Sequence, residues 1–123
     1  MILVDTSVWV DHFRASDAQL VHLLELDEVL IHPFIVGEIA CGTLSDRALT
    51  LELLNQLPMA TVAQPDEVLG YIEGHGLHGK GIGYVDAHLL ASAAITGTKL
   101  WTRDKRLQTV ARALGYVQPG YAR

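Results

Sequence analysis

The sequence predicts an α/β fold, in which helices flank a short, mainly parallel central sheet of about five strands. Two observations favour this class. Short apolar runs recur along the chain, and between them lie segments whose apolar residues repeat with the period of a helix. Because strands that alternate with helices place those helices on both faces of a parallel sheet, we expect an α/β/α sandwich.

The first half of the chain predicts three strands and three helices. The apolar run MILV predicts a strand over 1–4, and the amphipathic pattern after it predicts a helix over 7–26, broken near residues 14–17. VLIH predicts a second strand over 29–32. Pro33 is well placed in the first turn of a helix over 33–44. A helix over 46–57 and a strand over 59–63, with the sequence MATVA, follow.

The second half predicts three helices and the last two strands. Helices are expected over 66–73, 85–95 and 106–114, and Gly97 and Gly115 end the last two in the C-cap role. KLW predicts a strand over 99–101 and YVQ another over 116–118. With no linker, repeat or low-complexity segment in between, we expect residues 1–123 to form one domain.

Composition restricts the class of protein. Half of the 123 residues are hydrophobic, which excludes a disordered chain, and no stretch approaches the roughly 18 apolar residues of a membrane span. The apolar start of the chain lacks the basic region of a signal peptide. The lone cysteine, Cys41, cannot form an internal disulfide, which is typical of a reducing compartment. We therefore expect a cytoplasmic protein that has no contact with a membrane.

The charges are unevenly distributed along the chain. The net charge is −5, but residues 1–75 carry −10 and residues 76–123 carry +5. The basic C-terminal portion could form a patch for a polyanion such as RNA. Basic residues scattered over a solvated surface would give the same totals, and the sequence leaves both interpretations open.

Three carboxylates stand where strands give way to helices. Asp5 follows the strand 1–4, Asp104 follows KLWT, and Asp86 lies at the start of the helix 85–95. Ligands of parallel sheets bind beyond the carboxyl ends of the strands, so Asp5 and Asp104 are candidate ligand-binding residues. Each of the three could instead cap a helix, because an aspartate there accepts free backbone N–H groups.

Glu38 lies inside a helix, where capping does not explain it. Its neighbours three and four positions away are apolar or small, which predicts that Glu38 lies on the packed stripe of the helix. A buried carboxylate is costly unless a cation or hydrogen-bond donors compensate it. A bound divalent metal would compensate both Glu38 and Asp86, and oxygen ligands select Mg²⁺ or Mn²⁺ over zinc.

Four motifs that carry these acids resemble the PIN-domain ribonucleases, and more narrowly the VapC-type toxins of bacterial type II toxin–antitoxin systems. They are MILVDTSVWVDHF, PFIVGEIACG, GIGYVDAHLLASA and LWTRDKRL, and together they span essentially the whole chain. The resemblance implies a PIN-like fold and a Mg²⁺-dependent endoribonuclease that hydrolyses RNA phosphodiester bonds, with Mn²⁺ able to substitute. The catalytic, metal-binding residues would be Asp5, Glu38, Asp86 and Asp104.

The resemblance also implies roles for individual residues. Asp5 and Asp86 would be the principal metal ligands, Glu38 and Asp104 would complete the coordination shell, and hydrogen bonds from Thr6 and Thr102 would orient the acids. Many relatives place an acid and an aromatic residue soon after the fourth acid. Here Arg106 and Leu107 stand there, which leaves one or two metal ions possible.

Three basic residues near the acids are candidates for contacts with RNA. Arg103 and Arg106 flank Asp104, and Lys80 lies in the glycine-rich run 74–83. Surface solubility would explain the same residues.

The resemblance implies protein partners as well. It predicts a homodimer and neutralisation by a cognate antitoxin protein whose C-terminal segment covers the site, with DNA contacted only indirectly through that antitoxin. The alternative is a catalytically inactive PIN-fold module that binds RNA or protein. Four mutually repelling carboxylates argue against the inactive module, because binding alone gives no reason to keep them.

Overall fold

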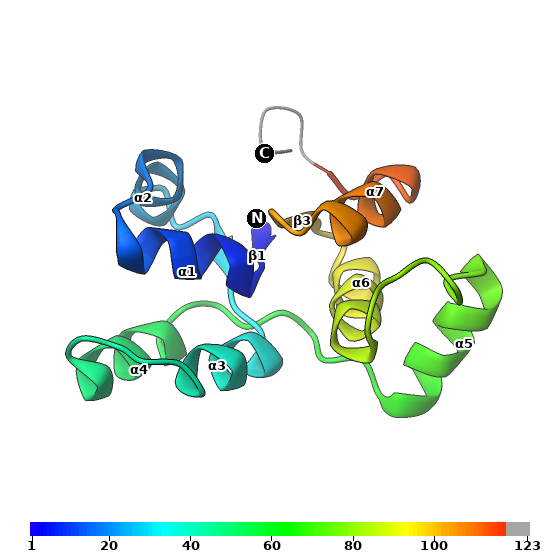
Figure 1. Ribbon diagram of the computed structural model, residues 1–123, viewed down its shortest axis with the longest axis horizontal. Coiled ribbons are helices and arrows are strands. Elements are labelled where there is room, and N and C mark those ends of the chain that lie inside the picture. The colour runs from blue at the N-terminus through cyan, green and yellow to red at the C-terminus, as the bar shows by residue number, and fades with distance from the viewer. Residues whose placement is uncertain (118–123) are drawn as a thin grey trace.

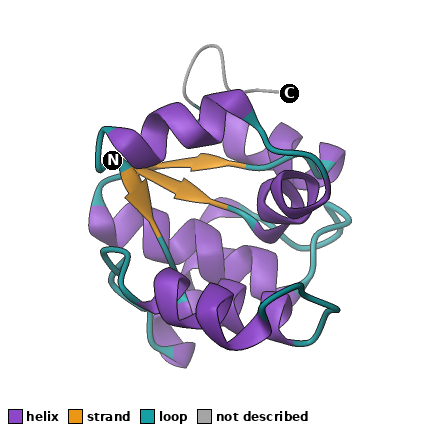
Figure 2. Ribbon diagram, turned by 90° about the vertical axis from the view of Figure 1, so that its left-hand side faces the viewer, coloured by secondary structure: helices purple, strands orange, loops and turns teal. Residues whose placement is uncertain are grey.

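The central sheet has three strands, all parallel, in the order β2-β1-β3. The computed structural model describes residues 1–117. Strand β1 spans Ile2–Val4, β2 spans Val29–Leu30 and β3 spans Lys99–Trp101. Helices lie on both sides of this sheet, as Figure 2 shows, which confirms the expected α/β class with a parallel sheet.

The helices follow the order that the sequence predicts (Figure 1). The first predicted helix is broken at the expected place into α1, Thr6–Arg14, and α2, Ala18–Glu25. After β2 come α3, Pro33–Ala40, and α4, Arg47–Asn55. Helices α5, Pro65–His75, and α6, Tyr84–Thr96, precede β3, and α7, Lys105–Ala113, follows it. The largest difference in bounds is at α3, which ends at Ala40 instead of residue 44.

The prediction of about five strands is wrong for the described residues, which form three. In the segment 59–63 only Met59 pairs, through an isolated bridge to Ile31. The N–H groups of Thr61 and Ala63 donate to the hydroxyls of Thr96 and Ser92 on α6, so they are not available to another strand. Of the predicted strand 116–118, Tyr116 accepts a hydrogen bond from the N–H of Leu100 but is not part of a strand, and Gln118 lies outside the described residues.

The core packs around the sheet and takes residues from helices on both of its sides. Strand β1 is buried along its whole length, and seven consecutive residues of α6, 87–93, are buried. In the register of β1 and β3, Val4 pairs with Trp101, and the N–H of Asp5 donates to the Trp101 carbonyl at 2.8 Å. The carboxyl ends of these two strands therefore place Asp5 beside the turn 102–104. No helix within residues 1–117 is long and apolar enough to cross a membrane.

Candidate metal centre

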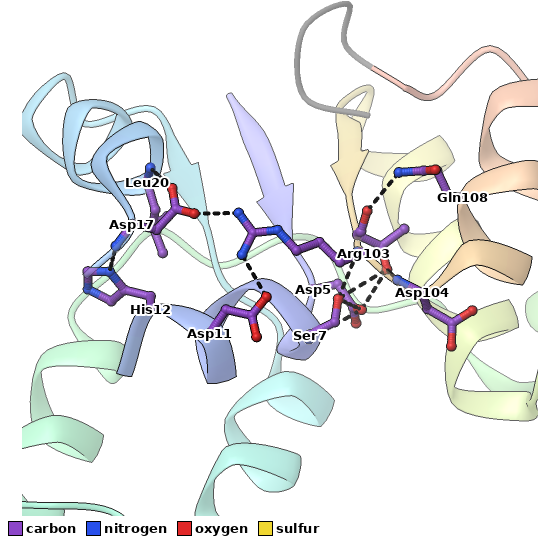
Figure 3. Close-up of polar contacts among 10 residues, drawn as sticks. Asp5, Ser7, Asp11, His12, Asp17, Leu20, Arg103, Asp104 and Gln108 are labelled. Atoms are coloured by element: carbon purple, nitrogen blue, oxygen red, sulfur yellow. Dashed lines mark hydrogen bonds and ion pairs between the residues drawn. The ribbon is translucent and has the colours of Figure 1, made fainter. Parts of the chain in front are cut away.

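The Asp5 carboxylate is held by the two segments that follow β1 and β3. Asp5 is buried and caps the N-terminus of α1. Its Oδ2 atom accepts hydrogen bonds from the Ser7 hydroxyl at 2.8 Å, the Thr102 hydroxyl at 2.8 Å and the Ser7 N–H at 3.4 Å. Figure 3 shows these contacts converging on Asp5 beside Arg103 and Asp104. Three donors on one oxygen fix the carboxylate in a single orientation.

Glu38 reaches the same region from α3, which packs against α1. The Thr6 hydroxyl donates to its Oε1 atom at 2.7 Å. The expectation that Glu38 lies on the packed stripe is wrong, because its side chain is exposed while Ile35 and Ile39 are the buried residues of this helix. Glu38 is therefore available to a ligand without the cost of burial in the core.

Asp86 is half-buried in the first turn of α6. Its Oδ2 accepts a hydrogen bond from the Gly83 N–H at 3.1 Å. Burial raises the pKa of Asp86 above its usual range, against the effect of the Gly83 N–H, and the negative charges of Asp5, Asp104 and Glu38 raise it further. The structure thus brings the other three predicted acids within electrostatic reach of Asp86.

Asp104 completes the group from the turn after β3. It is exposed and caps α7, where its Oδ1 accepts the Leu107 N–H at 3.0 Å. Its own N–H donates to the Thr102 hydroxyl at 3.1 Å. Since the Thr102 hydroxyl also holds Asp5, one threonine connects two of the acids.

The donor set fits a hard divalent cation. Within the described chain, no ion pair forms at Asp5, Glu38, Asp86 or Asp104. In each of these acids the protein donors contact one carboxylate oxygen and leave the other without a hydrogen bond. Oxygen donors of this kind are those that Mg²⁺ and Mn²⁺ prefer. As they stand, no three His, Cys, Asp or Glu side chains within residues 1–117 are gathered closely enough to hold an ion. Coordination of an ion would therefore require these side chains to lie closer together than they do here.

The three cations expected near RNA have different surroundings. Arg103 forms ion pairs with Asp11 and Asp17, and its guanidinium lies 5.3 Å from the centre of the Trp101 ring. Arg106 is exposed, and its side chain lies against Gly81 in the loop between α5 and α6. Lys80 is exposed in the same loop. The charge of Arg103 is thus already paired, whereas Lys80 and Arg106 lie at the surface beside this loop.

Three polar residues of this region do not stand out in the sequence. Ser7 contributes a hydroxyl to Asp5, and Asp11 and Asp17 receive the guanidinium of Arg103. The position of Ser7, two residues after a candidate capping aspartate, is a usable signal, because an N-cap side chain contacts the residues just after it. The pairs of Arg103 span more than 80 positions and have no local sequence signal.

Comparison with known proteins identifies the family. The PIN domain model matches residues 2–113. Ribonuclease VapC32 of Mycobacterium tuberculosis is 48% identical over 116 residues, which cover 94% of this chain and 94% of that protein. VapC ribonuclease Mb1587 of Mycobacterium bovis and Ribonuclease VapC11 of M. tuberculosis are each 32% identical over 127 residues, with 91% of this chain and 92% of those proteins covered. The match over nearly the whole length of each protein shows that the chain belongs to the PIN-domain family, within the VapC-type ribonucleases.

Proposed function

We propose that this protein is the toxin component of a toxin–antitoxin pair and acts as a Mg²⁺-dependent endoribonuclease. The observation that carries the proposal is the group of four carboxylates in which the charges of Asp5, Glu38 and Asp104 all act on Asp86. None of the four has a cationic partner among the described residues. The similarity to three proteins named as VapC ribonucleases supports RNA as the substrate.

Each acid has a distinct place in this proposal. Asp5 and Asp86 would be the principal ligands of the metal ion, and Glu38 and Asp104 would complete its shell directly or through water. Thr6 orients Glu38, and Thr102 orients Asp5. A bound Mg²⁺ or Mn²⁺ polarises a phosphodiester and lowers the pKa of a bound water.

The RNA backbone is bound beside the acids. Lys80 and Arg106 are exposed on the loop between α5 and α6 and on α7, so their charges are available to RNA phosphates. Arg103, the third cation predicted to contact RNA, already pairs with Asp11 and Asp17, so a phosphate would share its guanidinium with these two acids or displace them. The protein forms a homodimer in the cytoplasm, and a cognate antitoxin inhibits it by covering the acidic site.

Cleavage of structured RNA tests this function. The purified protein is incubated with RNA in Mg²⁺ or Mn²⁺, and we expect cleavage that stops when EDTA is added. Glu38→Gln, which can still accept the Thr6 hydroxyl, should reduce cleavage to background because it removes a charged ligand. Glu52→Gln is the matched control, since Glu52 is an exposed helical glutamate outside the site, on α4.

Two outcomes would contradict the function. Cleavage that persists in EDTA would show that the acids do not act through a metal. A protein that binds RNA but never cleaves it, in any of the ions, would identify the inactive RNA-binding module instead.

A further inference from the structure

Arg103 connects three elements around the candidate site. It lies in the turn between β3 and α7, and its guanidinium contacts Asp11 of α1 and Asp17 at the start of α2 (Figure 3). The Nη1 atom lies 2.8 Å from the Asp11 carboxylate, and Nη2 donates to Asp17. One side chain thus ties this turn to both helices that follow β1.

The acceptors of this guanidinium are themselves fixed. Asp17 caps α2 by accepting the Leu20 N–H at 3.0 Å, and its own N–H donates to His12 at 3.1 Å. Burial acts to raise the pKa of Asp17. The pKa is nevertheless lowered, because Arg103 donates a hydrogen bond to this carboxylate and carries a positive charge, and backbone N–H groups donate to it as well. The side chains of Arg103 and Asp17 are only 25% and 17% exposed, so solvent screens this pair less than an ordinary surface pair.

The main chain of Arg103 leads directly to Asp5. Its N–H donates to the Ser7 hydroxyl at 2.9 Å, and that hydroxyl in turn donates to the Asp5 Oδ2 at 2.8 Å. The preceding residue, Thr102, donates to the same oxygen. The position of the turn 102–104 therefore decides how the Asp5 carboxylate is oriented.

We propose that Arg103 is a positioning residue for the Asp5 carboxylate, and that it acts by fixing the turn 102–104 against α1 and α2. The proposal rests on the proposed function, because only there is Asp5 a metal ligand. Without the guanidinium, Asp11 and Asp17 are two carboxylates with no shared counter-charge, and the turn loses the side chain that ties it to α2. The hydroxyls of Ser7 and Thr102 then hold Asp5 less well.

A contact between Arg103 and RNA makes the opposite prediction for one variant. In the double variant Asp11→Asn/Asp17→Asn the guanidinium loses these two charged partners, while the asparagine that replaces Asp17 can still cap α2. If Arg103 positions Asp5, this variant has a weaker metal site. If Arg103 binds RNA, its freed charge and the loss of two negative charges tighten RNA binding.

The experiment compares this double variant, Arg103→Ala and the unaltered protein. Mn²⁺ affinity is measured by isothermal titration calorimetry, and kcat, KM and the salt dependence of RNA cleavage are measured below the unfolding temperature of each variant. We expect both variants to lose about tenfold in Mn²⁺ affinity and in kcat, with little change in KM or in the salt slope. Arg112→Ala, which removes an exposed charge at the end of α7, measures what loss of one positive charge alone does to KM.

Two results would overturn the positioning role. One is a double variant that keeps its Mn²⁺ affinity and lowers KM, which would make Arg103 an RNA contact. The other comes from amide hydrogen exchange. Arg103→Ala should speed exchange of the backbone N–H groups at positions 103 and 104 about tenfold, and Arg112→Ala should not. Unchanged exchange refutes the proposal whether or not the protein cleaves RNA, so its failure is distinct from failure of the proposed function.

Discussion

Asp5, Asp86 and Asp104 each use one carboxylate oxygen to bind the backbone near a helix start. They accept the N–H groups of Ser7 at 3.4 Å, Gly83 at 3.1 Å and Leu107 at 3.0 Å, respectively. In each of them the second oxygen has no donor among the described residues. Helix capping and metal binding are therefore compatible in one side chain. It follows that Asn variants, which preserve the acceptor, separate the two roles better than Ala variants, whose lost cap costs about 1 kcal/mol.

His32 is a second residue whose protonation state matters. It is buried at the N-cap of α3, where its Nδ1 accepts the Phe34 N–H and its Nε2 contacts the Ser92 hydroxyl at 3.0 Å. Burial lowers the pKa of His32 to about 4, and the nearby His88 contributes. In the unfolded chain the pKa is about 6.5. The unfolded state therefore binds a proton first as the pH falls, so His32 destabilises the fold between pH 6.5 and pH 4 and adds no further loss below pH 4.

We expect this histidine to cost about 2 kcal/mol of unfolding free energy between pH 7 and pH 5. Urea unfolding at the two pH values measures the loss. His32→Asn can keep the cap but cannot titrate, so its loss should be smaller by that amount. His22→Asn, at an exposed position on α2, is the control and should match the unaltered protein. Equal losses in all three proteins would show that His32 does not resist protonation. The raised pKa of Asp86 makes the folded state more stable as the pH falls, which is the opposite effect. Asp86 is present in all three proteins, so its effect cancels when their losses are compared.

At the scale of elements, the sequence predicts helix ends that depend on neighbouring residues, but it does not predict contacts between segments that are far apart in the chain. The break between α1 and α2 and the ends of α6 and α7 follow from periodicity and capping residues near them. The segment 59–63 has the composition of a strand, but hydroxyls of α6, some 30 positions later, take two of its N–H groups. The nearness of the other three acids to Asp86 could be anticipated because each stands in a recognisable motif, and their role as metal ligands stays a prediction. The pairs of Arg103 depend on how α2 packs near the turn 102–104, which no local pattern encodes.

The loop between α5 and α6 gives a prediction at the same scale. Gly81 and Gly79 both have positive φ, +79° and +70°, so alanine at either position is strained by about 1 kcal/mol. They differ in their surroundings. A Cβ at Gly81 would lie 2.7 Å from the Cδ of Arg106, whereas a Cβ at Gly79 would meet nothing within 4 Å. Only Gly81→Ala must therefore displace Arg106.

We expect Gly81→Ala to raise the KM for RNA several-fold and Gly79→Ala to leave it nearly unchanged, although both should lower the unfolding temperature. In an Arg106→Ala background the difference between the two glycine variants should disappear, because the contact that distinguishes them is gone. Steady-state kinetics and thermal unfolding of the three single and two double variants check this. A difference in KM that survives in the Arg106→Ala background would mean that the loop itself, not Arg106, contacts RNA.

At the scale of the whole molecule, the fold brings acids from an acidic part of the sequence and from a basic part of the sequence to one place. Residues 1–75 carry −10 and residues 76–123 carry +5, yet the second half supplies Asp86 and Asp104 to Asp5 and Glu38 of the first half. The basic residues near this point do not neutralise the acids in the described chain, and Arg103 is paired elsewhere. The folded protein therefore retains repulsion between Asp86 and the other three acids, which a divalent cation would relieve. Binding of that cation is then linked to stability and to pH.

This linkage predicts that Mn²⁺ raises the unfolding temperature of the unaltered protein. At one hundred times its dissociation constant, an ion that binds only the folded state adds about 2.7 kcal/mol of stability. The raised pKa of Asp86 means that the folded, ion-free protein holds a proton there at pH values where the unfolded chain has lost it. Protons therefore compete with the ion, and the increase should shrink as the pH is lowered toward that pKa.

Asp86→Asn separates this linkage from a general effect of salt. The variant should unfold at a higher temperature than the unaltered protein when no divalent ion is present, because one repelling charge is gone, and Mn²⁺ should then add little at any pH. Glu52→Gln, an exposed position on α4 away from the acids, should keep both the increase and its pH dependence. Differential scanning calorimetry at several pH values, with Mn²⁺ or with EDTA, measures both. If Mn²⁺ stabilised Asp86→Asn as strongly as the unaltered protein, the ion would have to bind away from these four carboxylates.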